Sequence, residues 1–236
     1  MQLFYHPQAK QTNQQLVFDK EESRHIIKVL RKNTGDILNI TNGIGVFFTS
    51  EIEIANHNKC VVKLIDETPQ QPLPYKLHLA VAPTKLNDRY EWFLEKATEI
   101  GITEITPIFC NHSERTKIKP ERYEKILQSA MKQSLKAFLP RLNKAVTFSE
   151  FVTLQSQKTA KKYIAHCVES KKNSLKDVLQ PKEEVLILIG PEGDFALSEI
   201  ELALKNNFIP VSLGESRLRT ETAAIVACHS VAFVNE

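Results

Sequence analysis

A run of aliphatic residues, Val185–Ile189, constrains the fold of this chain more than any other feature. It has no polar position, and a segment this uniformly apolar is typical of a strand in a parallel sheet that is covered on both faces. Further strands are expected at 77–82, 104–109, 162–168 and 209–213. Helices are expected at 86–100, at 120–138, in a segment that ends at Asn207, and from about 222 to 234. Because strands and helices alternate, the sequence predicts a parallel α/β domain.

The residues before this alternation have the pattern of a small β-barrel. Asn42-Gly43 is a hairpin signal, and a second turn is expected at 56–59. Three short β segments flank these turns, at 37–40, 46–54 and 61–65. Strands of this length and spacing favour a small barrel.

One helix is expected to interrupt these strands. Asp19 can cap its first turn, with Glu22 three residues later. Ile26, Ile27 and Leu30 would form its apolar side.

A proline-rich stretch, Thr68–Pro74, separates the two patterns. It has three prolines within six residues, which predicts a stiff, extended linker. The sequence therefore predicts two domains, residues 1–71 and residues 72–236.

The composition excludes several classes of protein. Of 236 residues, 42% are hydrophobic and 25% are charged, as in ordinary globular chains. No segment approaches the roughly 18 apolar residues of a membrane-spanning helix, and the first residues lack the pattern of a secretory signal. The four cysteines lie 50 or more residues apart, unlike those of a disulfide framework or zinc site. We therefore expect a cytoplasmic protein with no membrane segment and no metal.

Positive charge is concentrated locally although the net charge is only +3. Between Arg115 and Lys144, nine basic side chains stand against two acidic ones, which fits a surface that faces phosphate groups. A second basic face is expected on the first helix, where cations recur near helical spacing: Arg24, Lys28, Arg31 and Lys32. In both places a solvated helix face is the alternative.

A glycine-containing turn, Gly190-Pro191-Glu192-Gly193, follows the apolar run, and Gly214 follows the next strand. Parallel sheets bind ligands at the carboxyl ends of their strands, and glycine lets a ligand approach the main chain closely. The spacing matches neither a phosphate-binding loop nor a dinucleotide fingerprint, so ATP and NAD are poor candidates. A tight strand-to-helix turn without a ligand is the alternative.

A polar loop leads from Gly214 to the last helix. It brings Arg217, Arg219 and Glu221 to the start of that helix, where two arginines could hold a phosphate or a carboxylate through paired hydrogen bonds. In the structural alternative, Thr220 caps the helix and Glu221 suits its positive end.

These motifs resemble those of a known family. Gly190–Gly193, Leu213-Gly214 and Leu218–Ala223 strongly resemble the RsmE family of bacterial methyltransferases of the SPOUT class. Members use S-adenosylmethionine to methylate N3 of a uridine in 16S ribosomal RNA. Two further motifs are similar in the same order: Arg24–Arg31 with Gly35-Asp36, and Glu95–Gly101 with Ile105–Ile108.

The resemblance implies a fold and an assembly. The expected architecture is an α/β SPOUT domain with a parallel sheet and a C-terminal trefoil knot, preceded by a small PUA-like β-barrel that binds RNA. The family is a homodimer, and the last helix would contribute to its interface. The implied substrate is 16S ribosomal RNA in the small, 30S subunit.

The resemblance also implies where the ligands bind. S-adenosylmethionine would lie among three loops, near 166–169, 190–193 and 213–220. The residues assigned to it are His166, Ile189, Gly190, Gly193, Leu213, Gly214, Leu218 and Thr220. The residues assigned to RNA are Arg24, Lys28, Arg31, Lys32, Arg115 and Lys117.

Methylation of N3 of uracil assigns two roles. Because N3–H is a weak acid and a poor nucleophile until it loses its proton, a cation should stabilise the charge that develops on the carbonyl oxygens, and Arg219 is the candidate. Glu221, or a water that it holds, is the candidate for accepting the proton.

Three features depart from the family pattern. Asp194 stands where a second glycine is usual, and we expect it to adopt left-handed geometry and to cap the next helix, since Ala196 replaces the usual serine. Leu213–Arg217 also differs and adds the carboxylate of Glu215.

Two other functions remain open. One is another SPOUT reaction, such as ribose 2′-O methylation, and the other is a non-enzymatic RNA-binding or ribosome-assembly factor with a degraded pocket. An enzyme that acts on a nucleotide phosphate at the Gly190 turn is disfavoured, because the required lysine and acidic metal ligands are missing.

Overall fold

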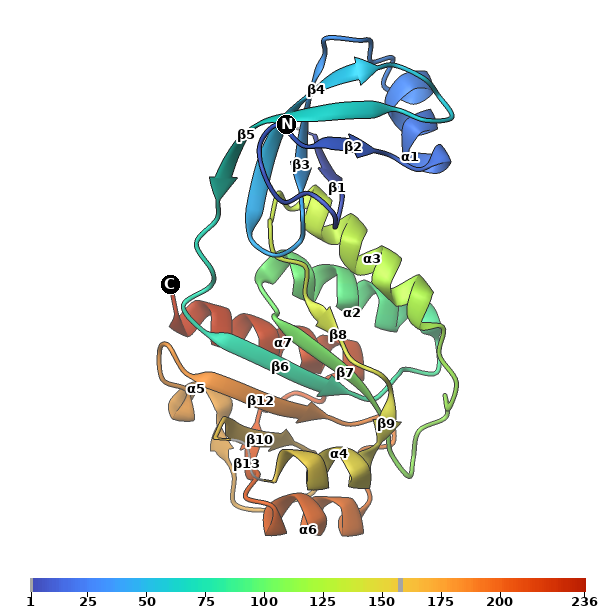
Figure 1. Cartoon of the computed structure of the whole chain (residues 1–236). Coiled ribbons are helices and arrows are strands. Elements are labelled where there is room, and N and C mark those ends of the chain that lie inside the picture. Colours follow the sequence, from blue (N-terminus) through green and yellow to red (C-terminus); the bar gives the residue numbers. More distant parts are fainter. Residues whose placement is uncertain (1, 157–158) are drawn as a thin grey trace. The chain divides into compact units, whose positions relative to one another are not determined.

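The computed structural model describes residues 2–156 and 159–236. The chain forms two compact units, each built from two stretches: Met1–Pro72 with Gln128–Leu139, and Leu73–Leu127 with Pro140–Glu236. Figure 1 shows the elements of both units in chain order.

The first unit is built on a curled five-stranded sheet of order β1-β3-β4-β5-β2. The strands are β1 (Leu3–Tyr5), β2 (Gln15–Val17), β3 (Ile37–Thr41), β4 (Val46–Ile54) and β5 (Val61–Pro69). β1 is parallel to β3 and the other pairs are antiparallel. The three predicted strands are confirmed. β1 and β2 were not predicted, because three residues are too few to show an apolar pattern.

The predicted linker is wrong at its start. Thr68 and Pro69 pair with Phe47 and Val46 as the end of β5. The strand tolerates Pro69 because a proline at a strand end removes no ladder hydrogen bond from the interior of the sheet.

The predicted helix of this unit is confirmed. Oδ1 of Asp19 accepts a hydrogen bond from the Glu22 amide at 2.8 Å at the start of α1 (Lys20–Arg24). The helix continues into a π-helical turn, η1 (His25–Val29), with Ile26 buried.

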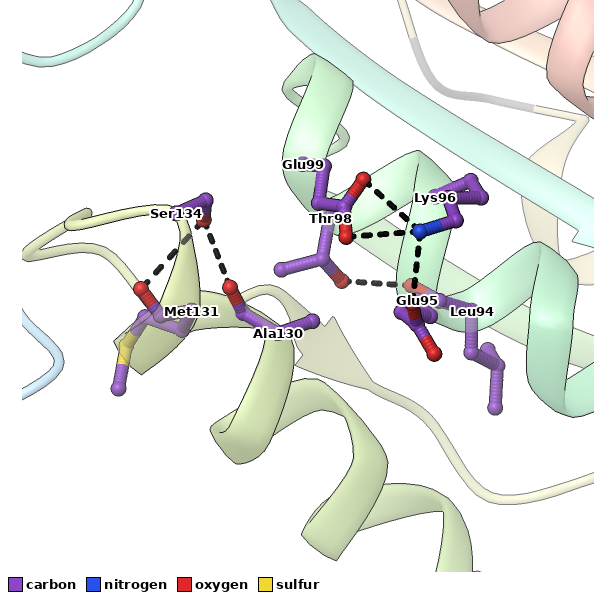
Figure 2. Close-up of polar contacts among 8 residues, drawn as sticks. All are labelled: Leu94, Glu95, Lys96, Thr98, Glu99, Ala130, Met131 and Ser134. Carbon is purple, nitrogen blue, oxygen red and sulfur yellow. Dashed lines mark hydrogen bonds and ion pairs between the residues drawn. The ribbon is translucent and has the colours of Figure 1, made fainter.

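Helix α3 (Pro120–Gln133) stops before its predicted end at residue 138. Oγ of Ser134 donates to the Ala130 carbonyl at 2.7 Å (Figure 2), and Leu135 has a φ of +53°, which breaks the helix. The chain beyond pairs with the β3–β4 hairpin: the Gly45 amide donates to Ala137 and the Leu139 amide to Gly43, each at 2.9 Å. These bonds take residues 136–139 away from the helix axis.

The second unit holds a parallel sheet of order β11-β13-β10-β12-β6-β7-β8. The strands on this path are β6 (Lys76–Val81), β7 (Glu104–Phe109), β8 (Arg141–Leu142), β10 (Lys161–Ala165), β11 (Asn173–Ser174), β12 (Glu184–Ile189) and β13 (Ile209–Ser212), and β9 (Val146–Thr147) pairs with β7. β12 is buried along Val185–Ile189, so the predicted parallel α/β domain is confirmed.

Helices cover this sheet on both faces. They are α2 (Asn87–Ile100), α4 (Phe148–Gln155), α5 (Leu175–Val178), α6 (Leu197–Lys205) and α7 (Thr220–Val234). Leu186 and Leu188 of β12 pack with residues of α4 and α6. Because side chains alternate along a strand, the intervening residues of β12 face the side on which α7 packs with α2 (Figure 1).

Side chains stabilise the C-terminal half of α2 (Figure 2). Nζ of Lys96 lies 2.7 Å from the Glu95 carboxylate and 3.0 Å from that of Glu99. The buried Thr98 hydroxyl donates to the Leu94 carbonyl at 2.7 Å. Gly101 ends the helix with a φ of +137°, as predicted. Across the two described ranges, no helix combines the length and the apolar content needed to cross a membrane.

Candidate active site

Three strand ends lie level at the carboxyl edge of the second unit's sheet. Ala165 of β10 is in register with Ile189 of β12 on one side and with Val211 of β13 on the other. The loops that follow these strands therefore leave the sheet side by side, at the edge where parallel sheets bind ligands. The structure thus brings together the three loops that the sequence assigned to the cofactor.

Thr220 joins the loop after β13 to the turn after β12. Its hydroxyl donates to the Gly190 carbonyl at 3.0 Å, and its side chain is buried. The structural alternative in which Thr220 caps the helix is therefore wrong: Arg219 occupies the N-cap position of α7, and Thr220 is the first helical residue. The hydroxyl donates to a carbonyl 30 residues away and does not cap its own helix.

The glycines of the turn have a packing role. A Cβ on Gly190 would lie 3.1 Å from the Phe195 ring, and one on Gly193 would lie 3.1 Å from Cβ of His112. Neither residue has a positive φ, so glycine is required here by packing and not by a left-handed backbone. Gly214 has a φ of +130° and open space beside it.

Asp194 supplies the left-handed residue of the turn, as predicted, with a φ of +63°. Its predicted role as a helix cap is wrong. Oδ2 of Asp194 instead accepts from the Cys167 amide at 2.8 Å, which joins the 190–194 turn to the loop after β10. The carboxylate of Glu199 caps α6, since it accepts from the Ala196 amide at 2.9 Å.

Lys172 holds the loop after β10 from its other side. Its ammonium donates to the carbonyls of His166 at 2.6 Å and Val168 at 2.9 Å. Neither Lys172 nor the Asp194 bridge was predicted, because both contacts depend on the tertiary arrangement of loops and not on local spacing.

His166 is a buried polar side chain at the centre of this arrangement. It is 8% exposed, and Nδ1 has no hydrogen-bond partner among the described residues. Burial lowers the pKa of the imidazole below its ordinary value, the Lys172 ammonium lowers it further, and Asp194 opposes both. A neutral imidazole can donate to or accept from a bound ligand.

Because the pKa of His166 is lowered in the folded protein, the stability of the protein depends on pH. The folded state disfavours protonated His166. The neutral imidazole therefore contributes fully to the free energy of unfolding above the ordinary histidine pKa of about 6.5, and this contribution is lost as the pH falls below that value. We expect His166→Gln to reduce the fall in Tm between about pH 7 and pH 5, measured by thermal unfolding. His229→Gln, at an exposed position on α7, is the control. An equal reduction in both variants would contradict the assignment.

The two residues assigned to catalysis lie at the start of α7. Arg219 is exposed and Glu221 is 7% exposed. Oε1 of Glu221 lies 3.7 Å from Nε of Arg89, while its Oε2 has no hydrogen-bond partner in the described part of the chain. A buried carboxylate oxygen that has no hydrogen-bond partner is placed to accept a proton from a bound substrate.

Glu192 of the 190–194 turn is half-buried, and no role was predicted for it from the sequence. Its Oε1 accepts from the Lys85 amide at 2.9 Å, and Oε2 has no partner among the described residues. Arg115 holds the same segment, since its guanidinium donates to the carbonyls of Thr84 and Lys85 at 2.9 and 2.8 Å.

The residues assigned to RNA fall in both units. In the first unit, Arg24, Lys28 and Arg31 are exposed and Lys32 is half-buried. In the second unit, Lys117 is exposed, but the guanidinium of Arg115 is partly engaged by the contacts above. No group of three or more metal-binding side chains occurs within residues 2–156 and 159–236.

Comparison with known proteins identifies the family. A model described as RNA methyltransferase domain matches residues 71–232, and one described as RNA methyltransferase PUA domain matches residues 18–65. A protein of Buchnera aphidicola named Ribosomal RNA small subunit methyltransferase E is 32% identical over 226 residues, which cover 90% of this chain and 86% of that protein.

Two solved structures are similar over nearly their whole length. The "probable rRNA-methyltransferase" of Porphyromonas gingivalis is 42% identical with a TM-score of 0.91, covering 100% of this chain and 98% of that one. A protein of Legionella pneumophila, solved in complex with the cofactor S-adenosylmethionine, is 32% identical with a TM-score of 0.87, covering 99% and 97%. The resemblance found in the sequence is confirmed, and the chain belongs to the RNA methyltransferase family of the Ribosomal RNA small subunit methyltransferase E proteins.

Proposed function

We propose that this protein transfers the methyl group of S-adenosylmethionine to N3 of a uridine in 16S ribosomal RNA. The observation that carries the proposal is the meeting of three loops at the level strand ends of Ala165, Ile189 and Val211. The names of the relatives support the ribosomal RNA substrate, and the cofactor in the Legionella structure supports S-adenosylmethionine.

The loop residues fit this cofactor. The buried Nδ1 of His166 has no partner among the described residues, so a polar group of the ligand can satisfy it. Gly214 has open space beside it, so a ligand can approach the main chain closely there. The residues that would hold the cofactor are His166, Ile189, Gly190, Gly193, Leu213, Gly214, Leu218 and Thr220. S-adenosylmethionine supplies a methyl group bonded to a positively charged sulfur.

The protein's part in the reaction is to position and ionise the base. N3 lies on the Watson–Crick edge, so the uridine must be unpaired and splayed out of its stack. The Arg219 guanidinium stabilises negative charge on the uracil carbonyl oxygens. Oε2 of Glu221, or a water bound to it, accepts the N3 proton.

The remaining parts of the proposal concern organisation. Residues 1–71 would form the RNA-binding domain and 72–236 the methyltransferase domain, whose C-terminal loops would form a trefoil knot. A homodimer would form through α7, where Phe233 is 66% exposed and leaves apolar surface for a partner. The substrate would be the assembled 30S subunit in the cytoplasm.

The direct test is incubation of the purified protein with labelled S-adenosylmethionine and small subunits that lack the modification, followed by nucleoside analysis. We expect label in N3-methyluridine. Label in a 2′-O-methylated ribose would instead indicate the other SPOUT reaction. No cofactor binding by calorimetry would indicate a non-enzymatic RNA-binding factor.

Asp194→Gly tests the cofactor loops separately. Glycine keeps the left-handed backbone accessible but removes the acceptor of the Cys167 amide. A hydrogen bond to a charged group contributes about 1.5–3 kcal/mol, and if a large share of this organises the loop, the Kd for S-adenosylmethionine should rise roughly 10-fold. Asp194→Asn tolerates positive φ but has a single acceptor oxygen for the two amides, of Cys167 and Phe195, that the carboxylate accepts from, so its Kd should lie between those of the unsubstituted protein and the glycine variant. Unchanged affinity in the glycine variant would contradict the bridging role.

A further inference from the structure

A basic cavity lies in the first unit, which contains none of the residues assigned to the cofactor. It has a volume of about 450 Å³ and is lined by Lys20, Arg24, Lys28, His57 and Asn58. Two elements far apart in the sequence form it: the helical segment α1–η1 and the turn between β4 and β5, which Figure 1 shows beside α1.

The π-helical turn keeps the three cations on one side of the helical segment. In an α-helix of about 3.6 residues per turn, a spacing of four carries each next residue slightly past the one before. A π turn is wider, because its hydrogen bonds join residues five apart. A spacing of four residues there covers slightly less than one full turn. Lys20 and Arg24 lie in α1 and Lys28 lies in η1. The rotation from Lys20 to Arg24 slightly exceeds a full turn and that from Arg24 to Lys28 is slightly less, so the three side chains stay on one side.

Ser23 fixes the β4–β5 turn against this helical segment. Its buried hydroxyl accepts from the Cys60 amide at 2.9 Å and donates to the Phe18 carbonyl at 3.1 Å. The Phe18 amide in turn donates to the Cys60 carbonyl at 3.0 Å. The cavity walls are therefore held by buried hydrogen bonds and are not two independent surface segments.

The charge of the cavity is not neutralised by its surroundings. No acidic residue lines it, and no carboxylate among the described residues lies within ion-pair distance of its three cations. The nearby acids are engaged elsewhere: Glu22 pairs with Lys132 at 3.3 Å, and Asp19 caps α1. The turn is closed by Asn56, which accepts from the Asn58 amide at 2.8 Å, so the exposed side chains of His57 and Asn58 are not needed to close it.

We infer that this cavity binds a backbone phosphate of the RNA substrate, with His57 and Asn58 as contacts in addition to the helix cations. An Arg guanidinium between two Lys ammonium groups suits a phosphodiester, since the arginine donates in a fork and the lysines add charge. Asn58 and His57 can donate to the remaining oxygens. The inference rests on the proposed function only for the identity of the nucleic acid.

The test is the salt dependence of binding to a fluorescein-labelled short single-stranded RNA, followed by anisotropy. Each neutralised phosphate of a single strand contributes about 0.7 to the slope of log affinity against log salt concentration. Because the cavity holds one phosphate, we expect the variant K20Q/R24Q/K28Q to lower this slope by about 0.7 and to weaken binding at low salt at least roughly 10-fold. We expect His57→Ala with Asn58→Ala to weaken binding by a smaller factor and leave the slope nearly unchanged.

Lys10→Gln, at an exposed lysine outside the cavity, is the control, and circular dichroism checks that each variant is folded. An unchanged slope in the triple variant, or an equal loss in the control, would overturn the inference. Calorimetry with S-adenosylmethionine separates this result from the proposed function, because the cavity variants should bind the cofactor normally. If these variants bind RNA normally and methylate uridine normally, the inference about the cavity is wrong and the proposed function is unaffected.

Discussion

Arg219→Ala should lower the methylation rate at saturating cofactor and RNA by roughly 100- to 1,000-fold. Arg219 is exposed at the N-cap of α7, and it forms no ion pair within the described ranges. Its guanidinium is therefore available to the substrate, and its loss removes the charge that stabilises the ionised uracil. Because the Arg219 side chain is exposed, the melting temperature should stay nearly unchanged. Single-turnover assays with labelled S-adenosylmethionine measure this effect.

Arg217→Ala is the matched control. Arg217 is an exposed arginine of the same loop, so it has the same charge and a similar setting. We expect a much smaller loss, mainly in the KM for RNA. An equal loss of turnover in both variants would mean that the loop acts through its overall charge, and the specific role of Arg219 would be wrong.

Glu221→Gln should lower turnover by roughly 100-fold or more, because the amide cannot accept the N3 proton. The glutamine is nearly isosteric and keeps a polar atom near Arg89, so folding should be retained. The rate at saturating substrates is the quantity to measure, with the Kd for the cofactor determined in parallel.

Arg89→Gln separates the two roles of Glu221. It removes the partner that lies 3.7 Å from Oε1 but leaves the carboxylate in place, so we expect a smaller loss of turnover than in Glu221→Gln. If the two variants lose the same activity, Glu221 acts only through its ion pair with Arg89. A normal rate in Glu221→Gln would leave Glu221 as a residue that complements the helix N-terminus.

The features predicted well from the sequence were those that depend on near neighbours. The apolar run Val185–Ile189 identified the central strand, Asp19 identified the start of α1, and Gly101 identified the end of α2. In each case the determining physics, which is burial on both faces, a side-chain cap or a positive φ, acts within a few residues.

The roles that were wrong depend on partners far along the chain. The Thr220 hydroxyl bonds Gly190, 30 residues away, and the Asp194 carboxylate bonds Cys167, 27 residues away. Local patterns favour capping for both residue types, and only the folded arrangement provides the competing acceptor and donor. The end of α3 at Gln133 was missed for the same reason, because the β3–β4 hairpin binds the residues that follow it.

The pairing of residues 136–139 with that hairpin affects how the protein can be divided. The chain passes between its two compact units after Pro72, after Leu127 and after Leu139, so neither unit is a single stretch of sequence. A fragment that stops at Pro72 would lose the bonds of Ala137 and Leu139 to Gly45 and Gly43, together with the Phe138 ring that packs on Gly45. Truncation at the proline-rich boundary would therefore leave the tip of the β3–β4 hairpin without these partners, and limited proteolysis there would not release two independent modules.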